Sequence, residues 1–314
     1  MNNQKGFLFI ATALLFLSLA SIFLLSWYVF YGSLTNKSQF EVFNPTEEEL
    51  AKVKDYPLCD GNQAGAGGCI LGVTTSGLPT SNSLPTSGYR RQRVQTDRGI
   101  FTIDIVAADL NSTRVIVDTA SDSDCPDNCP VLSLKDYVSR SGAYAGINGP
   151  YFCPATYSSC ANKKNSFDTL LMNKNKTYFN SSNNVYSNVP AVIFQGNSAR
   201  FVQRSLEWGR DTSPDAVIAN YPLLVFNSQI NFTGGGEAKL NGKGARAFIG
   251  TRDNMVYIGV VHGASAADSA KTLHTLGMQN ALNLDSGGST ALWNGGYKVG
   301  PGRGLPFAIL FKVK

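Results

Sequence analysis

Alternating apolar and polar positions after residue 98 predict a domain built mainly of β-strands. The segment GIFTIDIVAADL (99–110) alternates as a half-buried strand does. TRVIVDTA (113–120) follows after an Asn-Ser turn signal, so the two segments predict a β-hairpin. A second hairpin is predicted over RAFIGTRDNMVYIGVVHG (246–263), with its turn at 252–254.

Two other segments have a helical period instead. LSLKDYVSRSG (132–142) and SAADSAKTLHTLGM (265–278) each gather apolar residues on one face and close with a glycine. Because strands outnumber helices, the expected fold class is α+β, with a mixed β-sheet core and a few packed helices in a single domain (99–314). Further strands are predicted at 143–152, 168–172, 177–179, 190–195, 199–203, 216–219, 223–227, 280–285 and 306–313, with a turn and short strand at 287–293.

An uncharged apolar run at residues 7–31 predicts a transmembrane anchor. A span needs about 20 apolar residues, whereas the core of a signal peptide usually has about 7 to 15. The run continues past the small residues of Ser18-Leu19-Ala20. We therefore expect an uncleaved anchor preceded by a short cytoplasmic N-terminus (1–6). Aromatic residues suited to the membrane interface lie at its outer end: Trp27, Tyr28 and Tyr31.

Residues 32–98 have the composition of an extracytoplasmic stalk or linker. A short helix is predicted at PTEEEL (45–50), where proline and glutamates suit a helix N-terminus. Residues 59–98 are rich in Gly, Ser, Thr and Pro, and LPTS occurs twice, at 78–81 and 84–87. Such a composition favours an extended tether between the anchor and the domain.

Six cysteines follow the apolar run and fall into three close pairs. An even number of cysteines outside the apolar run indicates an oxidising compartment, so we expect the C-terminal domain to lie outside the cytoplasm. The sequence leaves the connectivity open, and we favour nearest-neighbour pairing. A zinc site built from the last four cysteines is the alternative, although zinc ligands usually have tighter spacing. The favoured disulfides are Cys59–Cys69, Cys125–Cys129 and Cys153–Cys160.

Charge and composition narrow the possible partners. The net charge is +5 without a long basic run, so no nucleic acid partner is expected. The acidic residues between 118 and 127 lack an EF-hand pattern. The string GKGARA (242–247) leads into a predicted strand rather than a helix, which argues against a dinucleotide site. We therefore expect no cofactor and no metal.

The letters DSGGS (285–289) raise the possibility of a nucleophilic serine. A serine protease needs a histidine base oriented by a carboxylate. The chain has two histidines, His262 and His274, and neither stands in the Ala-His-Cys setting of chymotrypsin-like proteases. The string also lacks the glycine that normally precedes the aspartate. The sequence thus argues against a protease.

Four predicted strands end in polar residues next to glycine, and such strand ends are where a rigid scaffold presents reactive groups. Successive glycines also let backbone N–H groups point at one anion. Each segment alone could be a tight turn. The segments are GING (146–149), the strand that begins at Arg246, His262-Gly263, and NLDSGGST (283–290).

Three of these segments together resemble the phosphodiester glycosidase family, the N-acetylglucosamine-1-phosphodiester α-N-acetylglucosaminidases. AGINGPYF (145–152) resembles its xxINGxYF segment, and ARAFIGTRDNMVYIGVVHG (245–263) resembles RTAIG…LxLVVVDG. LGMQNALNLDSGGSTAL (276–292) resembles LGAxNALNLDGGGSTxL. Two positions differ from the family pattern: Ser286 stands where the family usually has glycine, and His262 where it often has aspartate.

The resemblance implies a membrane-tethered, extracytoplasmic glycosidase that hydrolyses sugar-1-phosphodiester linkages of the N-acetylglucosamine-phosphate type. The phosphate-linked glycan would belong to the cell envelope or to an exopolysaccharide. Arg246 suits the phosphate because its planar fork matches phosphate oxygens. Asp285 would be nucleophile, base or cation stabiliser, and His262 an acid, a base or a phosphate contact.

The other expected site residues are substrate contacts and spare carboxylates. A glycosidase usually needs two acids, and Glu237 and Asp168 are second-choice carboxylates. Each of these residues also has a purely structural interpretation. Two other functions stay open: a non-catalytic glycan-binding or envelope module, and a phosphodiesterase that cleaves the P–O bond. The expected substrate contacts are Asn148, Gly149, Asn283, Ser286, Gly287, Gly288, Ser289 and Thr290.

Overall fold

The computed structural model describes residues 58–59, 70–71, 77–180, 188–208 and 213–314. The expected N-terminus and anchor (1–31), the helix at 45–50 and one partner of the Cys59–Cys69 disulfide lie outside these residues. Within the described part of the chain, no helix is both long enough and apolar enough to span a membrane.

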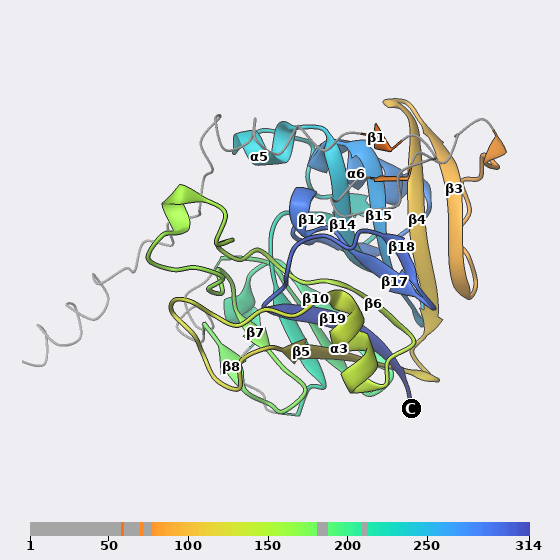
Figure 1. The fold of residues 1–314 in the computed structure, drawn as a ribbon. Coiled ribbons are helices and arrows are strands. Elements are labelled where there is room, and N and C mark those ends of the chain that lie inside the picture. The colour runs from red at the N-terminus through yellow and green to blue at the C-terminus, as the bar shows by residue number, and fades with distance from the viewer. Residues whose placement is uncertain (1–57, 60–69, 72–76, 181–187, 209–212) are drawn as a thin grey trace, which may run out of the picture. The chain divides into compact units, whose positions relative to one another are not determined.

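Three antiparallel sheets make up most of the described fold (Figure 1). Sheet A has seven strands in the order β13-β12-β16-β14-β15-β4-β3. Its strands are β3 (Gly88–Thr96), β4 (Gly99–Asp109), β12 (Leu223–Phe226), β13 (Gln229–Ile230), β14 (Gly244–Arg252), β15 (Met255–Ala264) and β16 (Asn280–Asn283).

Sheets B and C have five strands each. Sheet B, in the order β18-β17-β6-β19-β5, contains β5 (Thr113–Thr119), β6 (Ala145–Asn148), β17 (Leu292–Asn294), β18 (Tyr297–Val299) and β19 (Phe307–Val313). Sheet C, in the order β10-β9-β11-β7-β8, contains β7 (Leu171–Met172), β8 (Tyr178–Phe179), β9 (Ala191–Gln195), β10 (Ser198–Val202) and β11 (Ala216–Ala219). A short parallel pair joins β1 (Leu58–Cys59) to β2 (Ile70–Leu71).

The helices are few and short. They are α3 (Leu134–Ser141), α5 (Ala238–Asn241) and α6 (Ala266–Thr275), with single 3₁₀ turns η2 (Ser158–Cys160), η3 (Ser205–Glu207) and η4 (Gly287–Ser289). The helices predicted at 132–142 and 265–278 are confirmed, and each begins with a capping box, Ser133 with Asp136 in α3 and Ser265 with Asp268 in α6.

The expected mixed sheet is wrong, because every strand pair in sheets A, B and C is antiparallel. Helix α6 connects β15 to β16, which run in the same direction. These two strands do not pair, because β14 lies between them and is antiparallel to both. The helical crossover therefore creates no parallel ladder, and the domain is mostly β-sheet.

The expected hairpin over residues 99–120 is also wrong. Strand β4 pairs with β3 and β15 in sheet A, whereas β5 pairs with β19 in sheet B. The turn after β4 is closed on Asp109, whose side chain accepts the backbone N–H of Asn111 at 2.8 Å. The chain therefore leaves sheet A at this turn. The hairpin β14–β15 is confirmed, with Asp253 in its turn at φ 51°.

Strand β3 lies in the segment that the composition assigned to the linker. It forms a hairpin with β4 along its whole length, from Gly88 to Thr96. Its sequence GYRRQRVQT hides the alternation because three arginines interrupt it. Since β3 is the last strand of sheet A, these charged side chains suit an edge position. The folded region thus begins before Gly99.

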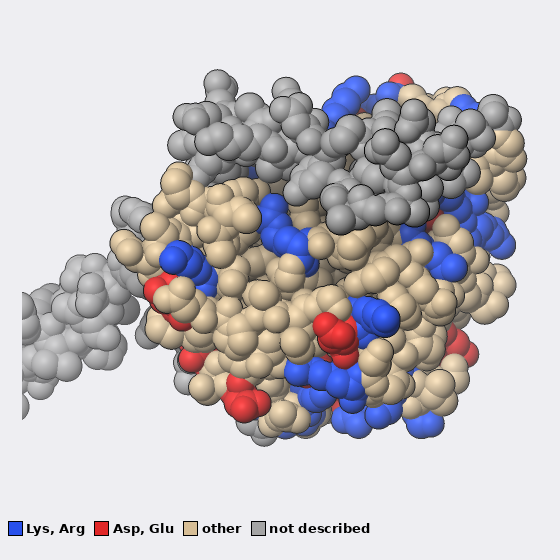
Figure 2. Space-filling view, viewed as in Figure 1, with Lys and Arg blue, Asp and Glu red and all other residues tan. Residues whose placement is uncertain are grey.

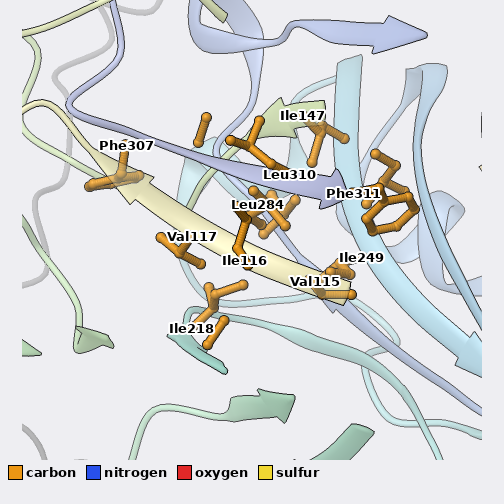
Figure 3. Packing of buried hydrophobic residues seen from close by; sticks show 14 of the residues in the cluster. Val115, Ile116, Val117, Ile147, Ile218, Ile249, Leu284, Phe307, Leu310 and Phe311 are labelled. Carbon is orange, nitrogen blue, oxygen red and sulfur yellow. The ribbon is translucent and has the colours of Figure 1, made fainter. Parts of the chain in front are cut away.

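The main core lies where the three sheets meet. Buried residues from β5, β6, β11, β14 and β19 point toward one another there (Figure 3). A second cluster lies between sheet A and α6, with Phe248 and Leu273 both fully buried. Alternate residues of β14 therefore face different layers, because Ala247 and Ile249 belong to the main core.

Two expected disulfides are confirmed, Cys125–Cys129 and Cys153–Cys160. The alternative of a zinc site from these four cysteines is wrong, because their sulfur atoms are bonded in pairs. Asn165 connects the two disulfide loops: its side chain donates to the carbonyl of Cys129 at 3.2 Å and accepts the N–H of Ala155 at 3.2 Å.

A buried carboxylate fixes α3 to sheet B. Asp118 on β5 accepts two hydrogen bonds from Arg140, at 2.7 and 2.8 Å, and one from Ser141 at 2.7 Å. Lys174 lies 2.9 Å from the same carboxylate. Burial opposes ionisation, but these hydrogen bonds outweigh it and lower the pKa of Asp118. Figure 2 shows basic and acidic side chains interspersed around α3.

Candidate active site

The first and last motifs are joined by hydrogen bonds of the backbone and of the Asn148 side chain. The N–H of Asp285, just after β16, donates to the carbonyl of Gly149 at 3.0 Å. The side-chain amide of Asn148 donates to the carbonyl of Asp285 at 2.7 Å, and its oxygen accepts the N–H of Ala291 at 3.2 Å. The ends of β6 and β16 therefore position Asp285 together.

Asn148 and Gly149 were expected to contact the substrate, and their geometry supports a structural role instead. Asn148 is fully buried and its amide bonds to backbone groups. A Cβ at Gly149 would lie 2.3 Å from the ring of Phe307, so only glycine fits there. Both residues hold Asp285 in place.

The carboxyl group of Asp285 has a raised pKa. Burial is the main cause, and hydrogen bonding from Ser289 is the largest opposing effect. The positive charges of Arg303 and Lys239 and the N–H of Ser286, which donates at 2.8 Å, also favour the ionised form. Asp285 thus combines a desolvated site with donors that can stabilise its carboxylate.

Backbone carbonyl groups fix the guanidinium of Arg246. Its Nε donates to Ala264 at 3.1 Å, and its Nη2 donates to Lys239 at 2.8 Å and to Gly242. Nη1 has no hydrogen-bond partner among the described residues. Burial lowers the pKa of Arg246, whereas nearby Tyr151 and Asp285 raise it. The guanidinium is therefore fixed close to Asp285 with one nitrogen available.

A lysine between two tyrosines adds a second cation. The Nζ of Lys239 lies 4.5 Å from the ring centroid of Tyr151 and 5.0 Å from that of Tyr221. It donates to the Tyr221 hydroxyl at 2.6 Å and lies 3.0 Å from Glu237. Glu237, a second-choice carboxylate, thus belongs to the site but is paired with this lysine.

The side-chain amide nitrogen of Asn283 bonds to Tyr151 and Tyr221 and does not face a ligand. It is fully buried, and its Nδ2 lies 2.8 Å from the Tyr151 hydroxyl and 3.1 Å from the carbonyl of Tyr221. The neighbouring Asn220 donates to the carbonyl of Asn283 at 2.7 Å and accepts the N–H of Tyr151 at 3.1 Å. These two asparagines support the walls of the site.

Asp168, the other second-choice carboxylate, lies in the same group. Its backbone N–H donates to the carbonyl of Tyr151 at 3.4 Å. Burial raises the pKa of Asp168 to about 6, against the lowering effect of Lys163 and Lys239, and the charge of Asp285 raises it further. Its carboxyl group has no hydrogen bond or ion pair with any described residue. The carboxyl group of Asp168 therefore lies near enough to Asp285 to be influenced by its charge.

The glycine turn after Asp285 is packed against Arg303. The N–H of Arg303 donates to the carbonyl of Gly288, and a Cβ on Gly288 would lie 2.4 Å from the guanidinium. Arg303 also reaches the Cys153–Cys160 loop, where it lies 3.3 Å from the hydroxyl of Thr156 and 5.2 Å from the ring centroid of Tyr157. The disulfide loop thus borders the turn that carries Asp285.

The remaining hydroxyl groups and glycines of this turn have local partners. Ser286 donates its hydroxyl to the carbonyl of Leu284 at 3.2 Å, and no described histidine contacts it. The hydroxyl of Thr290 lies 3.5 Å from the carbonyl of Ala245, and its N–H donates to the carbonyl of Gly287 at 3.0 Å. Ser286 therefore lacks the base that a serine nucleophile requires.

His262 was expected beside Arg246 and Asp285, and its contacts lie elsewhere. Its Nε2 is 2.6 Å from the carboxylate of Asp104. Along β15, Val261 pairs with Arg246 and belongs to the cluster under α6, so the next residue faces the opposite side of sheet A. No described contact joins His262 to Arg246 or Asp285.

Sequence reasoning missed several members of this group. Lys239 lies in the four-residue helix α5, and Tyr221 stands outside every recognised motif. Tyr151 could have been found, because it is part of the INGPYF segment. Arg303 follows a glycine-proline turn and has no signal of its own.

Comparison with known proteins identifies the family. The family model for phosphodiester glycosidases matches residues 141–312, more than half of the chain. No curated protein matches. Among solved structures, the catalytic domain of zebrafish N-acetylglucosamine-1-phosphodiester α-N-acetylglucosaminidase is similar with a TM-score of 0.55 and 14% identity, covering 76% of this chain and 87% of that one.

Two further structures are more distant. A hypothetical protein from Synechocystis has a TM-score of 0.48 and 14% identity, covering 72% of this chain and 62% of its own length. A putative exported protein from Burkholderia pseudomallei has a TM-score of 0.42 and 11% identity, covering 68% and 74%. The matched region 141–312 contains all three sequence motifs and the residues grouped around Asp285. The chain therefore belongs to the phosphodiester glycosidase family, a family of hydrolases.

Proposed function

We propose that the protein hydrolyses the bond between C1 of a sugar and the oxygen of a phosphodiester, with N-acetylglucosamine phosphate as the sugar part. The observation that carries this proposal is the grouping of Arg246, Asp285 and Asp168. Tyr151 lies among them, since Asp285 and Arg246 both affect its pKa. A fixed guanidinium next to two carboxyl groups suits a sugar phosphate.

The leaving group explains why cations matter more than a strong acid. A phosphate monoester has a second pKa near 6 and can depart without being fully protonated. The site must then hold phosphate charge and stabilise an oxocarbenium-like sugar. Arg246 offers Nη1 to phosphate, and the buried surroundings strengthen that interaction. Lys239 adds positive charge beside the tyrosines.

The two carboxyl groups, Asp285 and Asp168, have different roles in the proposed reaction. Asp285 receives the N–H of Ser286 and would stabilise the developing cation or attack C1 as a carboxylate. Asp168 has no competing partner among the described residues and would take a proton from water. Burial is the main cause of the raised pKa of Asp168, and the charge of Asp285 is the smallest of the effects on it.

The pH profile tests the role of Asp168. A base must be deprotonated, and the pKa of Asp168 is about 6, so kcat/KM should rise as the pH increases through about 6. Asp168→Asn should remove this rise and lower the plateau by about 100-fold. A wild-type kcat/KM that falls over this range would instead identify Asp168 as an acid. An unchanged profile in the variant would exclude it from catalysis.

Hydrolysis in oxygen-18 water tests the reaction itself. Cleavage of the C1–O bond should place the label in the free sugar of an N-acetylglucosamine-1-phosphate diester. Label in the phosphate would show cleavage of the P–O bond. Binding without turnover would support a non-catalytic glycan-binding module, and either result would overturn the proposal.

We also propose that residues 7–31 tether the protein to a membrane, with the domain outside the cytoplasm and acting on envelope or exopolysaccharide glycans. The apolar run supports the tether. The two disulfides support an oxidising compartment. Protease added outside intact cells should remove the domain, and complete protection of the domain would contradict this topology.

A further inference from the structure

Tyr151 is held at both its backbone and its hydroxyl, close to Asp285. It stands two residues after Gly149, whose carbonyl accepts the N–H of Asp285 at 3.0 Å. The N–H of Tyr151 donates to the side chain of Asn220 at 3.1 Å, and its hydroxyl lies 2.8 Å from Nδ2 of Asn283. Only 8% of the residue is exposed. The side chain therefore has a fixed orientation in the wall of the candidate active site.

The hydroxyl of Tyr151 lies among the charged groups of this site. Nζ of Lys239 is 4.5 Å from the ring centroid of Tyr151, and the backbone carbonyl of Lys239 accepts Nη2 of Arg246 at 2.8 Å. Asn283, which contacts the hydroxyl, stands two residues before Asp285. The charges of Asp285 and Arg246 are, after burial, the largest effects on the pKa of Tyr151. The hydroxyl therefore shares one site with these two groups.

The contact with Asn283 leaves the hydroxyl proton of Tyr151 without an acceptor. Nδ2 of Asn283 also lies 3.1 Å from the carbonyl oxygen of Tyr221 and 2.8 Å from that of Leu284. These carbonyls fix the nitrogen on this side, because the reverse orientation would place Oδ1 against their oxygens. An amide nitrogen only donates, so the hydroxyl of Tyr151 accepts from Asn283. No described residue accepts the hydroxyl proton in return.

An unused proton in a buried site indicates a ligand, because buried polar groups are almost always hydrogen-bonded. Burial is the main cause of the raised pKa of Tyr151, and the charge of Asp285 raises it further. The hydroxyl therefore stays protonated at neutral pH and is a donor rather than a base or a nucleophile. Nη1 of Arg246 is a second donor without a described partner. Two fixed donors in one buried site favour a group that becomes negatively charged.

We propose that the Tyr151 hydroxyl is a further catalytic group, which donates a hydrogen bond to the oxygen that leaves C1 with the phosphate. As the C1–O bond breaks, its electron pair passes to this oxygen, and the leaving group becomes a phosphate monoester anion. The hydroxyl stabilises the new charge and keeps its proton, because the phosphate monoester can depart as an anion. The inference rests on the proposed function, since it assigns one more residue to that reaction.

Tyr151→Phe tests this role because it removes only the hydroxyl. Nδ2 of Asn283 keeps its two carbonyl acceptors in this variant. With the full chain and the glycerol diester of N-acetylglucosamine 1-phosphate, kcat should fall about 100-fold, as for the loss of one fixed donor to a developing anion. KM should change by less than about threefold, since the charge on this oxygen develops only as the bond breaks.

Tyr137→Phe is the matched control. Tyr137 is a fully buried tyrosine of α3, and its hydroxyl donates to the carbonyl of Leu305 at 2.9 Å. The control loses a buried hydroxyl at a place that has no contact with the Asp285 group, so it should keep the wild-type kcat and KM.

Binding of the leaving group gives a readout that packing alone would not change. Glycerol 1-phosphate carries the full charge that the Tyr151 hydroxyl would face, so its Kd by calorimetry should be about tenfold weaker in Tyr151→Phe than in Tyr137→Phe. N-acetylglucosamine has no phosphate, and its Kd should be the same in both variants.

The outcomes separate the inference from the proposed function. An unchanged kcat in Tyr151→Phe, or a loss confined to KM, would overturn the inference. Equal Kd values for glycerol 1-phosphate in the two variants would also overturn it, as would the absence of binding by the wild type. If the wild type does not hydrolyse the diester, the proposed function fails, and the comparison of Kd values alone decides whether the Tyr151 hydroxyl binds phosphate.

Discussion

Asp285→Asn is expected to lower kcat/KM on an N-acetylglucosamine-1-phosphate diester by about a thousandfold, which corresponds to about 4 kcal/mol of transition-state stabilisation. The amide keeps the size of the carboxyl group and can still accept the N–H of Ser286. It removes the negative charge that would face the developing sugar cation or attack C1. Steady-state kinetics with the purified protein gives the measurement.

Ser286→Ala is the matched control for this change, one residue away on the same turn. Its hydroxyl donates to the carbonyl of Leu284, so the loss in kcat/KM should stay within about tenfold. Both variants should have the same melting temperature as the wild type. A wild-type rate in Asp285→Asn would show that Asp285 is not catalytic. A thousandfold loss in Ser286→Ala would show that the Ser286 hydroxyl takes part in catalysis.

Asp118→Ala is expected to lower the free energy of unfolding by about 3 kcal/mol at neutral pH. The carboxylate is buried and holds Arg140, Ser141 and Lys174, so its removal leaves two cations without their partner. It also removes the hydrogen bonds that join Arg140 and Ser141 of α3 to β5. Urea denaturation of the wild type and the variant gives the difference.

An exposed ion pair provides the control for this stability effect. Glu207 lies 2.8 Å from Arg204, and the two side chains are 35% and 54% exposed, so Glu207→Ala should cost about 1 kcal/mol or less. A loss at Asp118 no larger than that at Glu207 would contradict the role assigned to the buried carboxylate.

The effect of Asp118 should also depend on pH in a defined direction. Hydrogen bonds from Arg140 and Ser141 lower the folded-state pKa of this carboxyl group. The stabilisation that Asp118 provides is therefore fully present above the pKa of its carboxyl group in the unfolded chain, near 3.8. It is lost as the pH falls through the lower pKa of the folded state. The difference between wild type and Asp118→Ala should shrink on acidification below about pH 4. A difference that grows there would reverse the assignment.

Local signals in the sequence predicted the elements well where the interactions are local. The capping boxes at Ser133 and Ser265 bond within one helical turn, so the residues that start each helix also mark it. The hairpin β14–β15 was predicted because its turn and its alternation lie in one segment. The strands that pair with β4 were not predicted correctly, because the pairing with β15 depends on residues far away in the chain.

The sequence alone determined the family resemblance, the two described disulfide pairs as favoured, and the placement of Asp285 and Arg246 among the candidate residues. These inferences rest on motifs and spacing within short segments. Only the tertiary structure decided which polar residues face one another. Asn148 and Asn283 turned out to bond within the protein, because the ends of β6 and β16 bury them. Side-chain alternation on β15 places His262 on the opposite face of sheet A from Arg246. The packing of α5 places Lys239 next to Arg246. Neither placement could be predicted, because the fold and not the position in the chain fixes which residues are neighbours.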